Sequence, residues 1–274
     1  MLVNIPNAIT INTVSGGGKF PFNFQSRIHE SGLTSCFLSP LRVIDWEPIL
    51  SERPDGYCLI TNAEHNEYDR RNMWVPIQEI ASREKIEHTA FDQDHIVIPT
   101  TKFSSFVNEI SHYNFDWYLW PVIPSFDQVL QCSIADWSPK TGKLALDGLI
   151  GPELFHSSHD DTFQYIESRN PGIIRPALTA ALCQYIGGIL AESQSKLSVE
   201  IIPPNDALIS EIIHSETAFC LPSQKPIIHD EKITFVFSDV KQNWSKNSPD
   251  NIRGELNYEI SNGSWVMTFN ENPS

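Results

Sequence analysis

The sequence predicts an α+β fold in which mainly antiparallel sheets with hairpins pack against several short helices and one long core helix. Apolar side chains alternate along short segments bounded by Gly, Pro, Asn and Asp, a pattern typical of strands joined by hairpins. Other segments space apolar side chains three and four residues apart, which is typical of helices. With 274 residues, of which 41% are hydrophobic, the chain is long enough to bury a sizeable core.

The N-terminal part of the chain is predicted to consist mainly of strands and turns. Residues 53–56, Arg-Pro-Asp-Gly, have the composition of a tight turn, because Pro presets one backbone angle and Gly permits a positive φ. The polar residues 62–72 are expected to form an exposed loop. The regular elements predicted around them are strands at residues 8–14, 20–24 and 57–60 and a helix at residues 76–87.

The clearest strand–turn–helix unit lies at residues 96–110. An apolar strand is expected at residues 96–98, and Thr100 or Thr101 is expected to cap the helix that follows. The apolar face of this helix is formed by Phe103, Phe106, Val107 and Ile110. A strongly aromatic strand is predicted at residues 115–120, and we expect it to pack in the core rather than to stack on bases or sugars.

The central part of the chain is predicted to contain a hairpin and a capped helix. Strands are expected at residues 129–137 and 143–150, because Ser-Pro-Lys-Thr-Gly at residues 138–142 has turn composition. A helix is expected at residues 159–169, because carboxylates in its first turn would complement the helix dipole. Asn-Pro-Gly at residues 170–172 is expected to end that helix.

The C-terminal part of the chain is predicted to contain the long core helix and a final hairpin. A wide apolar face predicts the long helix at residues 176–193, and Asn205 or Asp206 is expected to cap a shorter one. Asn262-Gly263 between alternating segments is a strong hairpin signal. The strands predicted in this part are residues 197–202, 232–237, 255–260 and 265–269.

The chain contains no internal repeat and no low-complexity linker. The prolines at 121 and 124 mark the expected boundary between two α+β parts, residues 1–122 and 123–274. One continuous domain remains the alternative, because 274 residues suit either arrangement.

The chain is strongly acidic, with 34 Asp and Glu against 19 Lys and Arg and a net charge of -15. Such a field repels phosphate backbones, so we expect no direct nucleic-acid binding, and it suits a basic protein partner. Five scattered cysteines without a CxxC pair indicate free thiols in a reducing compartment. The absence of a signal-peptide pattern and of a sufficiently long apolar run predicts a soluble cytoplasmic protein without a membrane span.

One cluster of potential metal ligands occurs at the predicted start of the helix at residues 159–169. His156, His159, Asp160 and Asp161 combine imidazoles and carboxylates, which are suitable ligands for zinc, manganese or iron. If they share one face at a helix start, a carboxylate there could orient a metal-bound water for hydrolysis. The alternative is an ordinary capped helix start with surface histidines.

Other candidate motifs are weaker. Asp92-Gln-Asp-His95 and the Glu64–Asp69 segment each place carboxylates near a histidine and could form acid–base pairs, although polar residues are common in loops. Gly16–Lys19 lacks the Walker spacing, and no GxSxG elbow occurs. Trp244 and Trp265 lie near turns and are the candidate exposed contact residues.

These observations predict an acidic, soluble interaction protein, such as an immunity protein, an inhibitor or a complex subunit, that binds a basic protein and needs no cofactor. The first alternative is a hydrolase that uses a divalent metal at the His156 cluster. The second is an enzyme whose catalytic residues are far apart in the sequence, because triads assemble in space. The oligomeric state, the partner and any substrate are open at this level.

Overall fold

The computed structural model describes residues 8–12, 23–38, 46–51, 53–65, 77–92, 95–109, 113–134, 145–159, 163–220, 228–229, 231–239 and 252–270. The chain forms two compact units. Unit 1 comprises Met1–Arg27, Phe37–Ser39 and Leu178–Ser274, and unit 2 comprises Ile28–Cys36 and Pro40–Ala177. Residues on both sides of the expected boundary near residue 122 therefore belong to unit 2.

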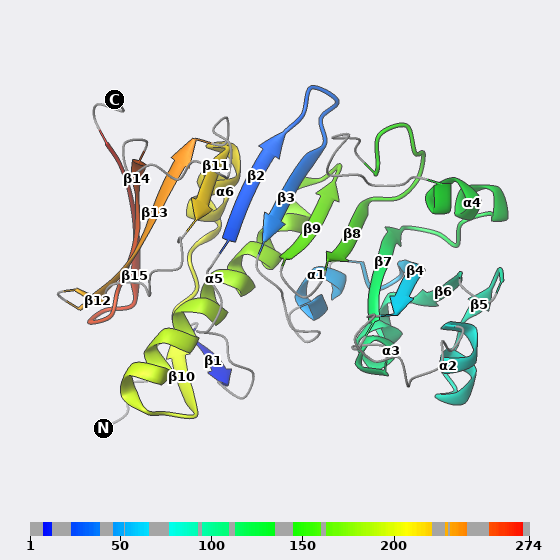
Figure 1. The fold of residues 1–274 in the computed structure, drawn as a ribbon, viewed down its shortest axis with the longest axis horizontal. Helices are drawn as coiled ribbons and strands as arrows, with labels where there is room; N and C mark the ends of the chain where they lie inside the picture. The colour runs from blue at the N-terminus through cyan, green and yellow to red at the C-terminus, as the bar shows by residue number, and fades with distance from the viewer. Residues whose placement is uncertain are drawn as a thin grey trace. The chain divides into compact units, whose positions relative to one another are not determined.

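The sheet of unit 2 has the strand order β3-β9-β8-β7-β4-β6-β5 (Figure 1). The pairings described from β9 to β5 are all antiparallel, which confirms the predicted fold class for this unit. The strands are β3 (Thr34–Leu38), β4 (Tyr57–His65), β5 (Thr89–Ala90), β6 (Ile96–Pro99), β7 (Tyr113–Trp120), β8 (Leu154–His159) and β9 (Phe163–Ser168). The helices are α1 (Glu47–Ser51), α2 (Ile77–Arg83), the 3₁₀ turn η2 (Thr100–Lys102), α3 (Phe103–Glu109) and α4 (Phe126–Ile134).

Helices pack on both faces of the sheet of unit 2. Successive residues of a strand point to opposite faces, so two neighbouring residues of β7 show what covers each face. On one face the ring of Trp117, in β7, lies 5.3 Å from that of Trp46, which precedes α1, and 4.8 Å from that of Phe103 in α3. On the other face the hydroxyl of Tyr118 donates to the carbonyl oxygen of Cys132 in α4 at 3.2 Å. The aromatic strand predicted at residues 115–120 is thus core, and its two faces hold helices from different parts of unit 2.

Unit 1 contains the antiparallel strand order β15-β14-β13-β11-β2, with β12 paired to β13, and a separate pair β1-β10. The ring of Tyr185 in α5 lies 5.6 Å from that of Phe235 in β13, so α5 packs against this sheet. The strands are β1 (Ile9–Asn12), β2 (Asn23–Ile28), β10 (Ser198–Ile201), β11 (Thr217–Cys220), β12 (Ile228–His229), β13 (Lys232–Asp239), β14 (Ile252–Glu259) and β15 (Ser264–Phe269). The helices are α5 (Pro171–Gln194), which begins in unit 2, and α6 (Asp206–His214).

The long core helix is α5, and it begins earlier than the sequence predicts. The side chain of Asn170 accepts a hydrogen bond from the backbone N–H of Gly172 at 2.9 Å, so residues 170–172 start α5 instead of ending a preceding helix. By length and composition α5 is, within the described part of the chain, a helix that could cross a membrane. However, 72% of its most apolar window is buried in the protein, as in a core helix.

Two predictions for the central part of the chain are wrong. Residues 126–134 form α4 and not a strand, and residues 145–150 form turns. Residues 154–168 form the hairpin β8–β9 where a helix was expected from residue 159. The reason for the second difference is burial: β9 pairs with a strand on each side, and its residues 164–168 are all buried.

Several local predictions are confirmed. The strand–turn–helix unit forms as β6, η2 and α3, although Thr100 donates its hydroxyl hydrogen to the carbonyl of Arg53 instead of capping the helix. Asn205 caps α6 by accepting from Leu208 N–H at 2.9 Å. The predicted C-terminal hairpin is β14–β15, where Gly263 has φ 68°.

The loop predicted at residues 62–72 is wrong at its start, because residues 62–65 extend strand β4.

Candidate functional site

The candidate site of unit 2 is built around α4, whose start is specified by a capping box. The backbone N–H of Ser125 donates to the side-chain oxygen of Gln128 at 2.8 Å, and the N–H of Gln128 lies 3.4 Å from the hydroxyl of Ser125. Each bond satisfies an N–H group that has no partner within the first helical turn. Val129 and Cys132, three residues apart, are buried and attach the inner face of α4 to the unit.

The outer side of α4 and its two flanking segments expose an unusual concentration of large apolar side chains. Of ten such side chains in the described residues, five lie here. Their exposed fractions are 63% for Val122, 48% for Ile123, 50% for Phe126, 39% for Leu130 and 82% for Ile150. We call these five residues the α4 patch. Concentrations of this kind on a protein surface are typical of binding sites.

The two sequence segments that form the α4 patch are adjacent in space. The side-chain amide of Gln128 in α4 donates to the carbonyl oxygen of Ile150 at 3.4 Å. The ring of Phe91, in the loop between β5 and β6, stacks on Phe126 with centroids 6.2 Å apart. Figure 1 shows α4 as a short helix beyond the end of β7.

The charged side chains within these segments are all carboxylates. In residues 121–134 and 145–153 they are Asp127 and Asp147, which are exposed, and Glu153. Glu153 is paired with Arg53 through two hydrogen bonds of 2.5 and 2.8 Å. Within these two described segments the exposed charged side chains are therefore carboxylates, and the guanidinium of Arg169 is bonded to the backbone of the second segment. The carboxylates favour a cationic partner.

The loop that carries Ile150 is held in place by Glu167 in β9 and by Arg169, which follows the end of β9. Glu167, which is fully buried, accepts a hydrogen bond from the backbone N–H of Leu146 at 2.8 Å and another from the hydroxyl of Tyr165. The guanidinium of Arg169 donates to the carbonyl oxygens of Leu146, at 2.8 Å, and Leu149. These hydrogen bonds fix the backbone of the loop at several points. The exposed side chain of Ile150 is therefore held in one place before a partner binds.

Burial determines the electrostatics of this support. Removal from water raises the pKa of the Glu167 carboxyl above its usual value, while the hydrogen bonds from Tyr165 and the backbone partly oppose the increase. Burial also raises the pKa of the Cys132 thiol, on the buried face of α4, to about 12. Cys132 is therefore a neutral packing residue and not a nucleophile.

A hydrogen-bonded Asp–His–Ser array lies at the edge of the α4 patch. Nδ1 of His95 lies 2.7 Å from both carboxylate oxygens of Asp92, and Nε2 lies 2.7 Å from the hydroxyl oxygen of Ser133. His95 immediately precedes β6, and its loop is closed by the bond from Phe91 N–H to the carbonyl oxygen of His95 at 2.9 Å. Ser133 belongs to the last turn of α4. The sequence places the carboxylates of Asp92 and Asp94 near His95, and in the structure Asp92 is hydrogen-bonded to His95. A serine 38 residues away extends this bond to a third residue.

Comparisons of this chain with family models, curated proteins and solved structures found no match. Its function therefore has to be inferred from its own residues.

The sequence analysis does not reveal the α4 patch, because it predicts a strand at residues 129–137. The Ser-x-x-Gln pattern at residues 125–128 was the local signal that could have revealed the helix. The partnership of Ser133 with His95 has no sequence signal, because it depends on the tertiary fold.

The residues of the predicted metal cluster have different surroundings. His156 is 2% exposed, and its ring stacks on Trp117 in the core of unit 2. Residues 156 and 159 both belong to β8, whereas the sequence predicted a helix that begins at residue 159. Asp160 and Asp161 lie outside the described residues. Within the described part of the chain no group of three or more His, Cys, Asp or Glu residues is arranged to hold a metal ion, and the metal site remains a prediction.

The other candidates from the sequence are placed as follows. Trp265 is half-buried in unit 1, where its indole N–H donates to the carbonyl oxygen of Ile202 at 2.7 Å and its ring lies 4.9 Å from that of Tyr258. Trp244 lies outside the described residues, as does most of the Glu64–Asp69 segment. The role of both tryptophans as contact residues therefore remains a prediction.

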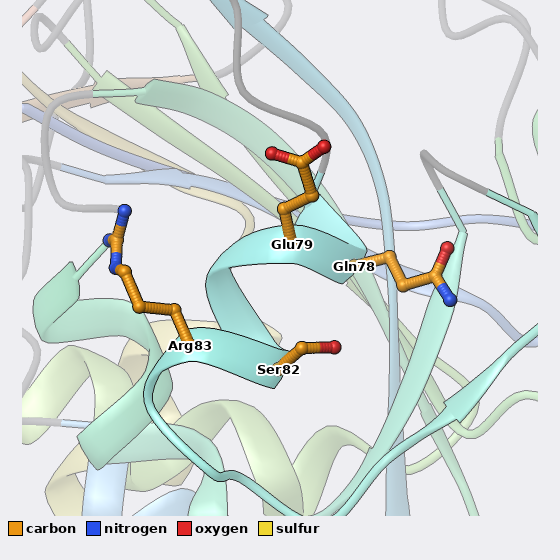
Figure 2. A pocket seen from close by; sticks show the side chains of 4 residues that line it. All are labelled: Gln78, Glu79, Ser82 and Arg83. Carbon is orange, nitrogen blue, oxygen red and sulfur yellow. The ribbon is translucent and has the colours of Figure 1, made fainter.

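An open surface pocket lies beside α2. The described residues that line it are all on this helix, and Figure 2 shows their side chains spreading away from one another. They are Gln78, Glu79, Ser82 and Arg83. Arg83 is bonded to the neighbouring Glu84 at 2.9 Å. The described part of the pocket thus contains no hydrogen-bonded nucleophile and base, in contrast to the edge of the α4 patch.

Proposed function

We propose that this chain is an acidic interaction protein that binds a basic protein partner through the α4 patch. The observation that carries the proposal is the concentration of exposed apolar side chains around α4, accompanied by carboxylates alone among the charged side chains of the same segments. An immunity protein, an inhibitor of a basic toxin or a subunit of a complex would each use such a surface.

The apolar side chains supply the affinity in this proposal. Complete burial of a Leu, Ile or Phe side chain contributes about 1.5–3 kcal/mol, and removal of a half-exposed one from water contributes roughly half of that. In the free protein the exposed fractions of three patch side chains are 50% for Phe126, 39% for Leu130 and 82% for Ile150. A partner that covers them gains several such contributions, as in the central region of known interfaces.

Charge supports a basic partner over a second copy of the chain. Two molecules with a net charge of -15 each repel one another, and carboxylates on both sides of a contact are costly. A cationic surface removes this repulsion and is attracted over a distance of about one Debye length, roughly 10 Å at moderate salt. The hydrogen bond that Glu167 accepts from Leu146 N–H and the one that Arg169 donates to the Leu146 carbonyl also preorganise the loop around Ile150, so binding orders fewer groups.

The first prediction concerns the apolar side chains of α4. The double substitution Phe126→Gln and Leu130→Gln removes apolar surface without changing charge, so it should weaken partner binding at least about tenfold. The tagged full chain is used to capture proteins from a lysate of its native host. Candidates with net positive charge are then purified, and their dissociation constants are measured directly with each variant.

The matched control removes two exposed apolar side chains of unit 1, Leu197→Gln and Val266→Gln, which are 83% and 43% exposed in the structure. This control should bind the purified partner as the unsubstituted chain does. The proposal is overturned if both double variants bind equally, if the partner that depends on α4 is acidic, or if the α4 variant instead abolishes self-association of the chain in sedimentation experiments.

A further inference from the structure

We propose that Asp92, His95 and Ser133 form a nucleophilic site that transfers acyl groups from esters with an apolar acyl chain. In this site Ser133 is the nucleophile, His95 is the general base and Asp92 is a positioning residue. The nucleophilic chemistry rests on the hydrogen-bond geometry of these residues, whereas the substrate class uses Phe126 and Leu130, which also belong to the α4 patch.

The hydrogen bonds determine where the protons lie. An ionised carboxylate only accepts, so Nδ1 of His95 carries the hydrogen that is shared with the two oxygens of Asp92 at 2.7 Å. The backbone N–H of His95 also donates to Asp92, at 2.8 Å, and this second bond orients the carboxylate. In the neutral imidazole Nε2 is then the acceptor, and it faces the hydroxyl of Ser133 at 2.7 Å. This is the tautomer that a general base for serine needs.

The reaction balances without any further reagent. Oγ of Ser133 attacks the ester carbonyl carbon while its proton moves to Nε2 of His95, and the carbon–oxygen bond to the alcohol breaks as His95 returns the proton to the leaving oxygen. Water then attacks the acyl-serine, again losing a proton to His95. The acid is released and the serine hydroxyl is restored.

The surroundings of Ser133 indicate the substrate class. Phe126, Leu130 and Ser133 occupy positions i, i+4 and i+7 of α4 and so lie along one side of the helix. The stack of Phe91 on Phe126 continues this apolar stripe at its far end. At 1.5 Å per residue the stripe runs for about 10 Å from Phe126 to Ser133. An apolar acyl chain lying along it would place its carbonyl carbon beside the hydroxyl.

The hydroxyl of Ser133 has a second possible acceptor, the carbonyl oxygen of Val129 at 3.0 Å. When His95 is protonated, Nε2 donates to Ser133 and the hydroxyl turns to Val129. When His95 is neutral, the hydroxyl can donate to Nε2. A bridge with a purely structural role would show the same contacts but would not make Ser133 reactive, so reactivity distinguishes the two roles.

The test is covalent labelling of the full-length protein with a fluorophosphonate, followed by mass-spectrometric mapping of the adduct. In this reaction the serine oxygen bonds to phosphorus, fluoride leaves and His95 takes the proton. We expect the adduct on Ser133, no labelling of Ser133→Ala above background, and labelling of His95→Gln slowed by about 100-fold or more. Hydrolysis of p-nitrophenyl butyrate should be lost in the same variants.

The role of Asp92 is tested by the pH profile. Asp92→Asn should slow labelling and change its dependence on pH, and Asp92→Glu should restore part of the rate, whereas a purely structural role predicts an unchanged profile. The control is Ser210→Ala, a half-buried serine of α6, which should label normally. The inference is overturned if the unsubstituted protein is not labelled, if the adduct maps to another residue, or if a folded Ser133→Ala variant hydrolyses the ester at the original rate.

Discussion

At the scale of single residues, His156 shows how the core of unit 2 controls a titratable group. Its ring lies 4.6 Å from that of Trp46 and 5.3 Å from that of Trp117, and the side chain is 2% exposed. Burial lowers the pKa of His156 to about 3, and an interaction with Gln164 opposes this only in part. The imidazole is therefore neutral at physiological pH and packs as an aromatic ring.

This shift predicts a loss of stability in mild acid. The unfolded chain takes up a proton at His156 below about pH 6.5, whereas the folded chain does so only near pH 3. Because the unfolded state binds more protons in this window, the free energy of unfolding should fall as the pH decreases, by about 2 kcal/mol between roughly pH 7.5 and pH 5 from this residue alone. His156→Phe keeps a flat ring and should remove this part of the decrease. Urea unfolding of both proteins at the two pH values measures it, and identical pH dependence would contradict the assigned role.

At the scale of elements, α4 shows what the sequence could and could not predict. Elements with a local signature were predicted, such as α6 with its Asn205 cap and the hairpin around Gly263. The apolar content of residues 129–134 suits a strand as well as a helix, and only the capping pattern at residues 125–128 distinguishes the helix locally. The helix forms because that box satisfies its first turn and because one face is buried.

The hairpin β8–β9 could not be predicted from local chemistry. Acidic residues near position 160 suggested a helix start, but Tyr165 and Glu167 are buried in a strand with neighbours on both sides. Tertiary burial therefore overrides the local preference. The same limit applies to the site: the pairing of Asp92 with His95 is local and could be anticipated, whereas their link to Ser133 depends on how α4 packs beside β6.

The capping box leads to a prediction about α4 as a unit. Gln128→Ala removes the acceptor for Ser125 N–H and the link to the carbonyl of Ile150, so it should lower the free energy of unfolding by about 1 kcal/mol. Gln128→Glu keeps the acceptor but loses the amide donor, so it should retain most of the stability. Amide hydrogen exchange should accelerate in α4 for the alanine variant only. Equal exchange in both variants would show that the box does not hold the helix.

At the scale of the whole molecule, the excess of acid affects stability and binding in opposite ways. A net charge of -15 makes the folded chain repel itself, because folding brings the carboxylates closer together. In the proposed complex, the same charge would attract a basic partner toward the α4 patch. Salt screens both effects over a Debye length of roughly 10 Å at about 0.1 M. The two consequences of one charge distribution can therefore be separated by ionic strength.

Increasing NaCl from about 20 mM to about 300 mM should stabilise the free protein and weaken its complex. We expect the free energy of unfolding to rise by about 1 kcal/mol, which corresponds to an increase of about 2–4 °C in the melting temperature of a chain of this size.

Over the same range of salt the association rate with the proposed basic partner should fall steeply. The dissociation rate, which reflects the buried apolar contacts, should change little. Asp127→Asn together with Asp147→Asn should reduce the salt dependence of association, because both carboxylates are exposed beside the α4 patch. Calorimetry and stopped-flow binding measure the two responses, and an association rate that does not respond to salt would refute electrostatic attraction to this surface.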